Sequence, residues 1–280
     1  MSHQMEDQNI CDYQKYLVSE EKKSSTIQKY ERDIRAFSEW VGEKSVDRDL
    51  VLKWKEELCR KKYAAATINS MLSAVNGFFG FMGWTELKLK FLKIQNRIFR
   101  DQEKDLCRRE YERLLSAARG QGKERLLLLM ETICGTGIRV SEVKDITAEA
   151  VKKGRAEIYT KGKTRIILIS NKLRKKLLFY AKKQNIVSGA IFLTEKGNAL
   201  SRQQIWQEMK NLCREAGVES SKVFPHNLRH LFAAVFYASC KDIVKLADVL
   251  GHSSVETTRI YLISTGKEHM RQLDKLGLVQ

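Results

Sequence analysis

Four side chains near the C-terminus have the types and spacing needed for chemistry on a phosphate ester. His226 and Arg229 lie in the run Pro-His-Asn-Leu-Arg-His, His252 follows Leu-Gly, and Tyr261 comes nine residues after His252. A helix that begins at His226 places His226 and Arg229 on one face, where both can bind a single anion. Arg offers a fork of donors that matches phosphate oxygens, His exchanges protons near neutral pH, and a Tyr hydroxyl can be a covalent nucleophile. The set therefore predicts phosphoryl transfer through a phosphotyrosine.

The charge balance indicates a nucleic-acid partner. The 280-residue chain carries 51 Lys and Arg against 34 Asp and Glu, for a formal net charge of +17. Such a basic chain favours a polyanion, because binding releases the counterions condensed on it. No apolar run approaches the length that spans a bilayer, and the start does not resemble a secretory leader. We therefore expect DNA rather than membrane as the partner, and a cytoplasmic location.

Cysteine and histidine spacing predicts no metal site and no cofactor. The six cysteines lie at positions 11, 59, 107, 134, 213 and 240, with no Cys-x-x-Cys pair, and no histidine stands at ligand spacing from a cysteine. We expect reduced, mostly packed thiols, and we expect His3 to belong to a frayed terminus.

The residue pattern of 1–95 predicts a small helical domain that binds DNA. Apolar residues recur at helical spacing, and Lys and Arg are frequent on the remaining faces. The four short helices are expected at residues 10–17, 24–40, 46–58 and 65–81.

A linker is expected at residues 96–104, where periodicity weakens and charges crowd together. Residues 105–280 then predict a second domain, with two short strands joined around Gly162 and a second small hairpin at 191–200. Its helices are expected at 109–118, 123–134, 171–184, 201–216, from 226, at 242–250 and at about 255–261. The fold class is therefore mainly α with small β elements: an N-terminal four-helix DNA-binding domain followed by an α+β catalytic domain.

Each candidate residue also has an ordinary explanation. Arg139 comes two residues after the Gly-Thr-Gly turn, and an Arg in such a position is more often a surface charge. A Lys on a hairpin tip is usually solvated. His252 is also compatible with a helix cap and Tyr261 with a core position. His230, beside Arg229, points to a different face, where we expect it to pack or to bond to backbone. The joint occurrence of the set in this order is what favours a site.

On these residues the chain resembles the tyrosine recombinase, or phage integrase, family. The resemblance extends from about Leu106 to the C-terminus. In that family an Arg follows a Gly-Thr-Gly-type turn and precedes a Ser-Glu pair, as Arg139 does here. The family's His-x-x-Arg-His, Leu-Gly-His and nucleophile positions correspond to His226, Arg229, His230, His252 and Tyr261.

The family's catalytic lysine lies on a β-hairpin, often as Gly-Lys-Gly. Here the segment reads Thr160-Lys161-Gly162, so the preceding glycine is absent and Lys163 is a rival. We assign the role to Lys161.

The N-terminal domain resembles the family's helical, SAM-like core-binding domain only in size, helix count and charge. The extra arm-binding domain of some integrases has no room ahead of it. We therefore expect the minimal two-domain form.

The resemblance implies cleavage without metal or ATP. Arg139 and Arg229 hold the non-bridging phosphate oxygens, and His252 donates a further hydrogen bond as charge develops in the transition state. Lys161 protonates the departing 5′ oxygen.

The resemblance also implies that Tyr261 attacks to leave a 3′-phosphotyrosine and a free 5′ hydroxyl, with His226 as base or hydrogen-bonding partner. A 5′ hydroxyl from another duplex then reverses the step, which gives site-specific recombination rather than hydrolysis. The expected partners are double-stranded DNA and three further copies of the chain, in a homo-tetramer on two DNA sites. Accessory DNA-bending proteins are further candidates.

The C-terminal tail carries apolar residues amid charge, at Met270, Leu273, Leu276 and Leu278. It is compatible with a short amphipathic helix that docks on a neighbouring subunit or packs on its own domain.

Two other functions remain open from sequence. A type IB topoisomerase shares this chemistry but relaxes supercoils without joining two sites. A DNA-binding accessory protein without catalysis is the other, although the complete set of six residues argues against it.

Overall fold

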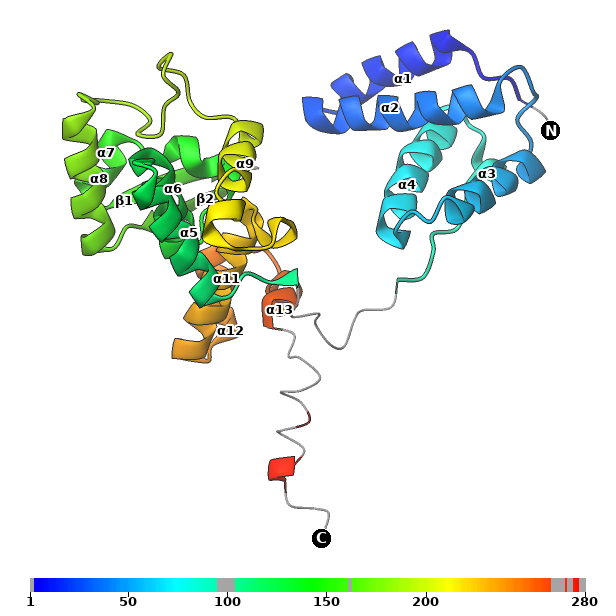
Figure 1. Ribbon diagram of the computed structural model, residues 1–280. Helices are drawn as coiled ribbons and strands as arrows, with labels where there is room; N and C mark the ends of the chain where they lie inside the picture. The colour runs from blue at the N-terminus through cyan, green and yellow to red at the C-terminus, as the bar shows by residue number, and fades with distance from the viewer. Residues whose placement is uncertain (1–2, 95–103, 161–162, 263–269, 271–273, 277–280) are drawn as a thin grey trace. The chain divides into compact units, whose positions relative to one another are not determined.

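The computed structural model describes residues 3–94, 104–160, 163–262, 270 and 274–276. The chain divides into two compact units, Met1–Asn96 and Arg97–Gln280 (Figure 1). The predicted linker at 96–104 falls, except for its last residue, outside the described residues. Its boundaries therefore stay a prediction.

The N-terminal unit is helical. It consists of α1 (Asp7–Ser19), α2 (Ser24–Val41), α3 (Arg48–Arg60), α4 (Ala65–Phe81) and the short 3-10 helix η1 (Thr85–Leu87). The four predicted helices are thus confirmed, with small differences at their ends.

The core of this unit is aromatic. Phe37 on α2 is fully buried and meets Trp54 of α3 and Phe79 of α4 in edge-on contacts, with ring centroids 4.9 Å and 5.8 Å apart. These contacts follow from the predicted stripes, because residues three and four apart on a helix present one face to the core.

The segment after η1 is fastened along α4 by two side-chain amides. Asn76 donates to the Leu89 carbonyl and accepts from the Leu89 amide, both at 2.8 Å. Asn69, seven residues earlier on the same helix, pairs with Leu92 in the same way at 2.9 and 2.8 Å. Seven helical residues and three extended residues both span about 10 Å, so the two pairings fit one straight segment.

His3 is not frayed as expected. Its backbone pairs with Val46, its ring stacks on Trp84 with centroids 4.5 Å apart, and its Nε2 lies 2.6 Å from Glu86 Oε1. No local pattern predicts this docking, because all three partners are distant along the chain.

The C-terminal unit surrounds one apolar helix, α6. The larger helices are α5 (Arg108–Gly120), α6 (Glu124–Thr136), α8 (Asn171–Lys183), α9 (Arg202–Lys210), α11 (Pro225–Cys240) and α12 (Ile243–Leu250). Shorter ones are η3 (Val140–Asp145), α7 (Ala148–Lys153), α10 (Cys213–Ala216), η4 (Ser220–Lys222), α13 (Val255–Arg259) and η5 (Ile260–Leu262). Five consecutive α6 residues, Leu126 to Met130, are buried, as the nearly continuous leucine run predicted.

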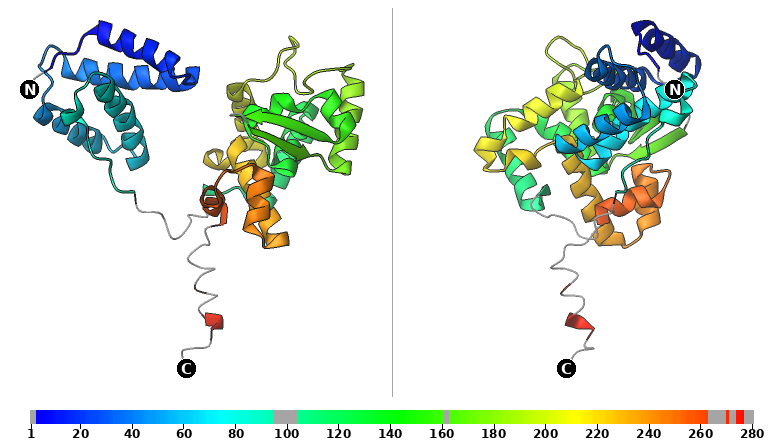
Figure 2. Two further views of the ribbon diagram at one scale, coloured as in Figure 1. Left: turned by 180° about the vertical axis from the view of Figure 1, so that it is seen from behind. Right: turned by 90° about the vertical axis from the view of Figure 1, so that its right-hand side faces the viewer.

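The predicted hairpin is present. Strands β1 (Arg155–Thr160) and β2 (Lys163–Leu168) are antiparallel, with register from Arg155↔Leu168 to Thr160↔Lys163. Figure 2 (left) shows the two strands in front of the helices of this unit. Ile158 and Ile167 are buried while Tyr159 and Leu168 are exposed, so one face of the hairpin packs on the helices.

Two details differ from the sequence prediction. The hairpin expected at 191–200 is reduced to an isolated bridge between Leu193 and Ala199. The helix expected at 201–216 is interrupted at residues 211–212, so that α9 and α10 are separate. Among the described residues, no helix is both long and apolar enough to cross a membrane.

Candidate active site

Arg229 is the buried centre of the site. Pro225 begins α11, and Arg229 points into the domain with 2% of its surface exposed. Its Nη2 donates to the Leu250 carbonyl at 2.9 Å, and its Nη1 donates to the Gly137 carbonyl. Burial lowers the pKa of this guanidinium to about 10, against the opposing effect of a hydrogen bond that the guanidinium donates to Tyr261. Arg229 therefore remains charged at neutral pH while it joins two turns.

Arg139 reaches the same region from the end of α6. Gly137 ends that helix at φ +64°, and a side chain there would collide with the Phe232 ring, so glycine is required. Arg139 Nη1 donates to Glu142 Oε1 at 3.0 Å, and its Nη2 donates to the Gly251 carbonyl at 3.3 Å. Its side chain is 38% exposed, so this guanidinium can meet a ligand from solvent.

Glu142 is a buried carboxylate between two arginines. It also accepts from the backbone amide of Arg139 at 2.9 Å, and Arg165 Nη2 lies 2.5 Å from its Oε2. Burial alone raises the pKa of Glu142, but the Arg139 amide and the Arg165 charge outweigh burial and lower it. The group is therefore an anion that holds both cations in place.

His252 follows Gly251, which ends α12 in the left-handed conformation at φ +62°. Its Nε2 lies 2.9 Å from Arg229 Nη2, and its Nδ1 lies 2.8 Å from Thr258 Oγ1. An arginine nitrogen can only donate, so Nε2 accepts and the proton belongs on Nδ1. Burial lowers the pKa of His252 to about 4, and Arg229, Arg139 and Arg165 add to the shift. The imidazole is neutral at neutral pH.

Tyr261 lies among three imidazoles. Its ring is parallel to that of His252 within 12°, with centroids 5.7 Å apart, and it meets His230 at 4.6 Å and His226 at 5.9 Å. The side chain is 7% exposed, and η5 carries it against α11. The phenol is thus held next to the imidazole that contacts Arg229.

The structure brings five of the six predicted site residues together. Hydrogen bonds connect Arg229 to His252, ring contacts connect His252 and His226 to Tyr261, and Arg139 binds the carbonyl next to His252. Lys161 lies outside the described residues, and of Lys163 only the backbone in β2 is described. The choice between the two lysines stays a prediction.

Sequence reasoning missed three contributors to the site. His230 was expected to pack elsewhere, but it contacts Tyr261; its four-residue spacing from His226 was the available signal. Arg165 occupies the inward face of β2 together with Ile167, and a charge in an apolar alternation could have marked it. Glu142 was noted only as part of a motif. Among the described residues, no cluster of His, Cys, Asp and Glu could hold a metal ion.

The sequence profile of the phage integrase family matches residues 104–268, and that of the family's N-terminal SAM-like domain matches residues 10–86. This chain belongs to the phage integrase family. It is a tyrosine recombinase, an enzyme of site-specific DNA strand exchange, as predicted.

Curated relatives match the sequence of this chain along most of its length. Tyrosine recombinase XerA of Thermococcus kodakarensis is 30% identical over 280 residues, which cover 97% of this recombinase and 96% of the relative. Tyrosine recombinase XerD of Vibrio cholerae is 25% identical and covers 89% and 88%.

Solved structures confirm the predicted fold class. A lambda integrase dimer bound to a core site superposes with a TM-score of 0.74 at 17% identity, over 93% of this recombinase and 77% of that chain. XerH bound to its DNA substrate gives 0.67 at 20% identity, over 88% and 78%. A lambda integrase tetramer has also been solved on a Holliday junction, with a TM-score of 0.71 at 18% identity, over 91% and 76%. The N-terminal unit is thus a SAM-like helical domain, and the C-terminal unit has the integrase catalytic fold.

Proposed function

We propose that this recombinase cuts and rejoins double-stranded DNA through a 3′-phosphotyrosine on Tyr261. The observation that carries the proposal is the contact chain from Tyr261 through His252 to Arg229. These contacts support the proposal because the phenol, a neutral imidazole and a buried cation lie next to one another.

The phosphate clamp is assigned to Arg139 and Arg229. Both guanidiniums are tied to the His252 turn, so a phosphate that reaches one meets a preorganised second cation. His252 is assigned as a third polar group, which donates a hydrogen bond to a non-bridging oxygen as negative charge develops in the transition state.

The proton transfers are assigned to His226 and Lys161. His226 is exposed at the first turn of α11, next to Tyr261, where the helix N-terminus favours a neutral imidazole able to accept the phenol proton. Lys161, at the connection between β1 and β2, protonates the 5′ oxygen as the P–O bond breaks. Attack forms the Tyr–O–P bond, so one ester replaces another and no ATP, metal or cofactor is consumed.

Strand exchange needs more than one copy, and we propose a homo-tetramer on two DNA sites, with accessory DNA-bending proteins where the sites require them. The domain organisation proposed is 1–95 for DNA grip, 96–104 for the linker and 105–280 for catalysis, in the cytoplasm.

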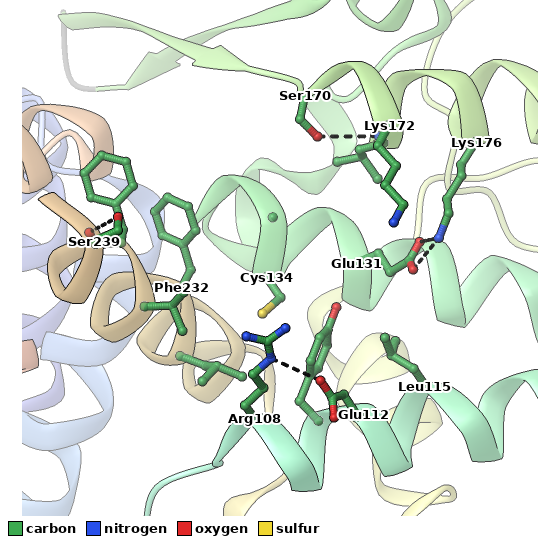
Figure 3. Close-up of a pocket in the computed structure, with 16 residues that line it drawn as sticks. Arg108, Glu112, Leu115, Glu131, Cys134, Ser170, Lys172, Lys176, Phe232 and Ser239 are labelled. Carbon is green, nitrogen blue, oxygen red and sulfur yellow. Dashed lines mark hydrogen bonds and ion pairs between the residues drawn. The ribbon is translucent and has the colours of Figure 1, made fainter.

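A groove in the catalytic unit supports subunit contact. It measures about 590 Å³ and lies between α5, α6, α8 and α11, with Cys134 and Phe232 among its lining (Figure 3). The ion pairs Arg108–Glu112 and Lys176–Glu131 flank it. We propose that the tail of a second copy fills this groove, since the tail alternates apolar residues with charges of both signs.

The groove can be tested with one substitution and a matched control. Val235 lines the groove and is 49% exposed, and Val244 on α12 is 56% exposed outside it. Val235→Glu should reduce synapsis, measured by native gel with two labelled duplexes, at unchanged binding to one duplex. Val244→Glu should leave synapsis intact, and equal synapsis in both variants would reject the groove.

Nicked suicide substrates test the chemistry itself. Candidate sites from DNA beside the gene should give a covalent adduct on a denaturing gel, with a free 5′ hydroxyl on the released strand. Tyr261→Phe should abolish the adduct and keep DNA binding, because only the nucleophilic oxygen is lost. An adduct that persists in this variant would overturn the proposal.

A further inference from the structure

We infer that Arg165 is a positioning residue for strand cleavage. Its side chain links the turn that carries His252 to Glu142, the carboxylate that orients Arg139. The inference rests on the proposed function of His252 and Arg139 and adds a residue outside the predicted set.

The contacts of Arg165 join three parts of the catalytic unit. From strand β2 its Nη2 reaches Glu142 Oε2 at 2.5 Å. Its Nη1 donates to the Val249 carbonyl at 3.2 Å and to the Leu250 carbonyl. These acceptors are 84 and 85 residues away in sequence, so one side chain connects the hairpin, the start of η3 and the end of α12.

The end of α12 binds three arginines through consecutive carbonyls. Val249 and Leu250 accept from Arg165, Leu250 also accepts from Arg229, and Gly251 accepts from Arg139. The last carbonyls of a helix lack intrahelical partners and carry partial negative charge, so cations are stabilised there. His252 follows these acceptors directly, and its position is therefore set by how the arginines hold them.

Arg165 is suited to positioning rather than to contact with DNA. Its side chain is 13% exposed, against 38% for Arg139. A planar fork can bind a carboxylate and carbonyls at once, whereas a lysine ammonium on a flexible stem cannot hold the same geometry. Glu142, shared with Arg165, then holds Arg139 through both its backbone amide and its guanidinium.

Gly251 confirms how closely Arg165 approaches this turn. A Cβ built on Gly251 would collide with the Arg165 side chain, at Cδ. The turn therefore packs directly on the guanidinium stem, and a small change on either side separates them.

The test compares Arg165→Met and Arg165→Lys with the control Arg155→Met. Arg155 lies on β1, is 55% exposed and forms an ion pair with Glu157. Single-turnover cleavage should fall about 10- to 100-fold in Arg165→Met, the scale for displacing catalytic groups by about an ångström. Arg165→Lys should recover only part of the rate, and Arg155→Met should cleave normally. Affinity for the duplex should be unchanged in all three.

A second readout separates positioning from a general loss of structure. Burial holds the pKa of His252 low, and Arg165 is one of three arginines, with Arg229 and Arg139, whose charges lower it further. Removal of Arg165 should raise the NMR-measured pKa of His252 relative to that of the unsubstituted protein, at unchanged DNA affinity. Arg155→Met should leave that pKa in place. If Arg165→Met does not fold, Gly251→Ala perturbs the same contact from the other side and should show the same slow cleavage.

Normal cleavage and an unchanged His252 titration in Arg165→Met would overturn the inference while leaving the proposed function intact. Full recovery in Arg165→Lys would also overturn it, because charge alone would then suffice. An adduct in Tyr261→Phe would instead overturn the proposed function, and the His252 titration would still decide whether Arg165 holds the turn.

Discussion

The two units of this recombinase bury different kinds of side chain. In the described part of the N-terminal unit one polar side chain is buried, Asp33, and Lys29 neutralises it at 2.5 Å. The described residues of the catalytic unit include six buried polar side chains: Thr132, Thr136, Glu142, Asn227, Arg229 and Thr258. Four of these lie at the candidate site or at the α6 turn that leads to it. The N-terminal core is almost entirely apolar, whereas the catalytic unit buries charged groups that hold its site together in addition to an apolar core.

Truncating a buried ring in the N-terminal unit should give the largest loss of unfolding free energy. Phe37→Ala removes the ring that joins three helices and should cost about 3–5 kcal/mol of unfolding free energy. Urea unfolding followed by tryptophan fluorescence measures the loss. Phe179→Ala, a matched change at a ring that is 67% exposed on α8, should cost less than about 0.5 kcal/mol. Equal losses would mean that the aromatic cluster is not the stabilising core.

Removing a cation should affect chemistry more than folding. Arg139→Ala and Arg229→Ala should each slow single-turnover cleavage by the equivalent of about 3 kcal/mol, the scale for one transition-state donor. Arg139→Ala should keep its melting temperature, because Glu142 retains Arg165. Arg229→Ala should also melt earlier, since buried carbonyls lose their donor. Normal cleavage in both variants would place the phosphate clamp elsewhere.

A substrate with a bridging 5′ sulfur should distinguish the two lysines. The thiolate departs without a proton, so Lys161→Ala should be slow on normal DNA and largely restored on the sulfur substrate. Lys163→Ala should show mainly weaker binding on both. Restoration that follows Lys163 would shift the assignment by two residues along the hairpin.

The smallest expected effect is a difference in the salt dependence of DNA affinity between the full chain and residues 105–280. If both units grip the duplex, the full chain neutralises more phosphates than residues 105–280 alone, and each contact adds about 0.9 to the slope of log affinity against log salt. Fluorescence anisotropy on one duplex measures both slopes. Identical slopes would show that the N-terminal helices do not touch DNA.

The difference between the units also explains what the sequence could predict. Helical stripes such as the one that contains Phe37 are local patterns, and the His-x-x-Arg spacing placed His226 and Arg229 correctly on one helix. Arg165 binds acceptors more than 80 residues away, and no periodicity records such a contact. The Asn69 and Asn76 pairings were missed for a related reason, because a polar residue on a helix does not reveal which backbone it binds.

The three carbonyls at the end of α12 also bear on mutational tolerance. Main-chain oxygens persist through every substitution, so no side-chain change at Val249 removes its acceptor. Only the donors, Arg139, Arg165 and Arg229, can be deleted by a codon change. We therefore expect the three arginine positions to be invariant among related recombinases. The position of Val249, which contributes only its carbonyl, should tolerate many side chains.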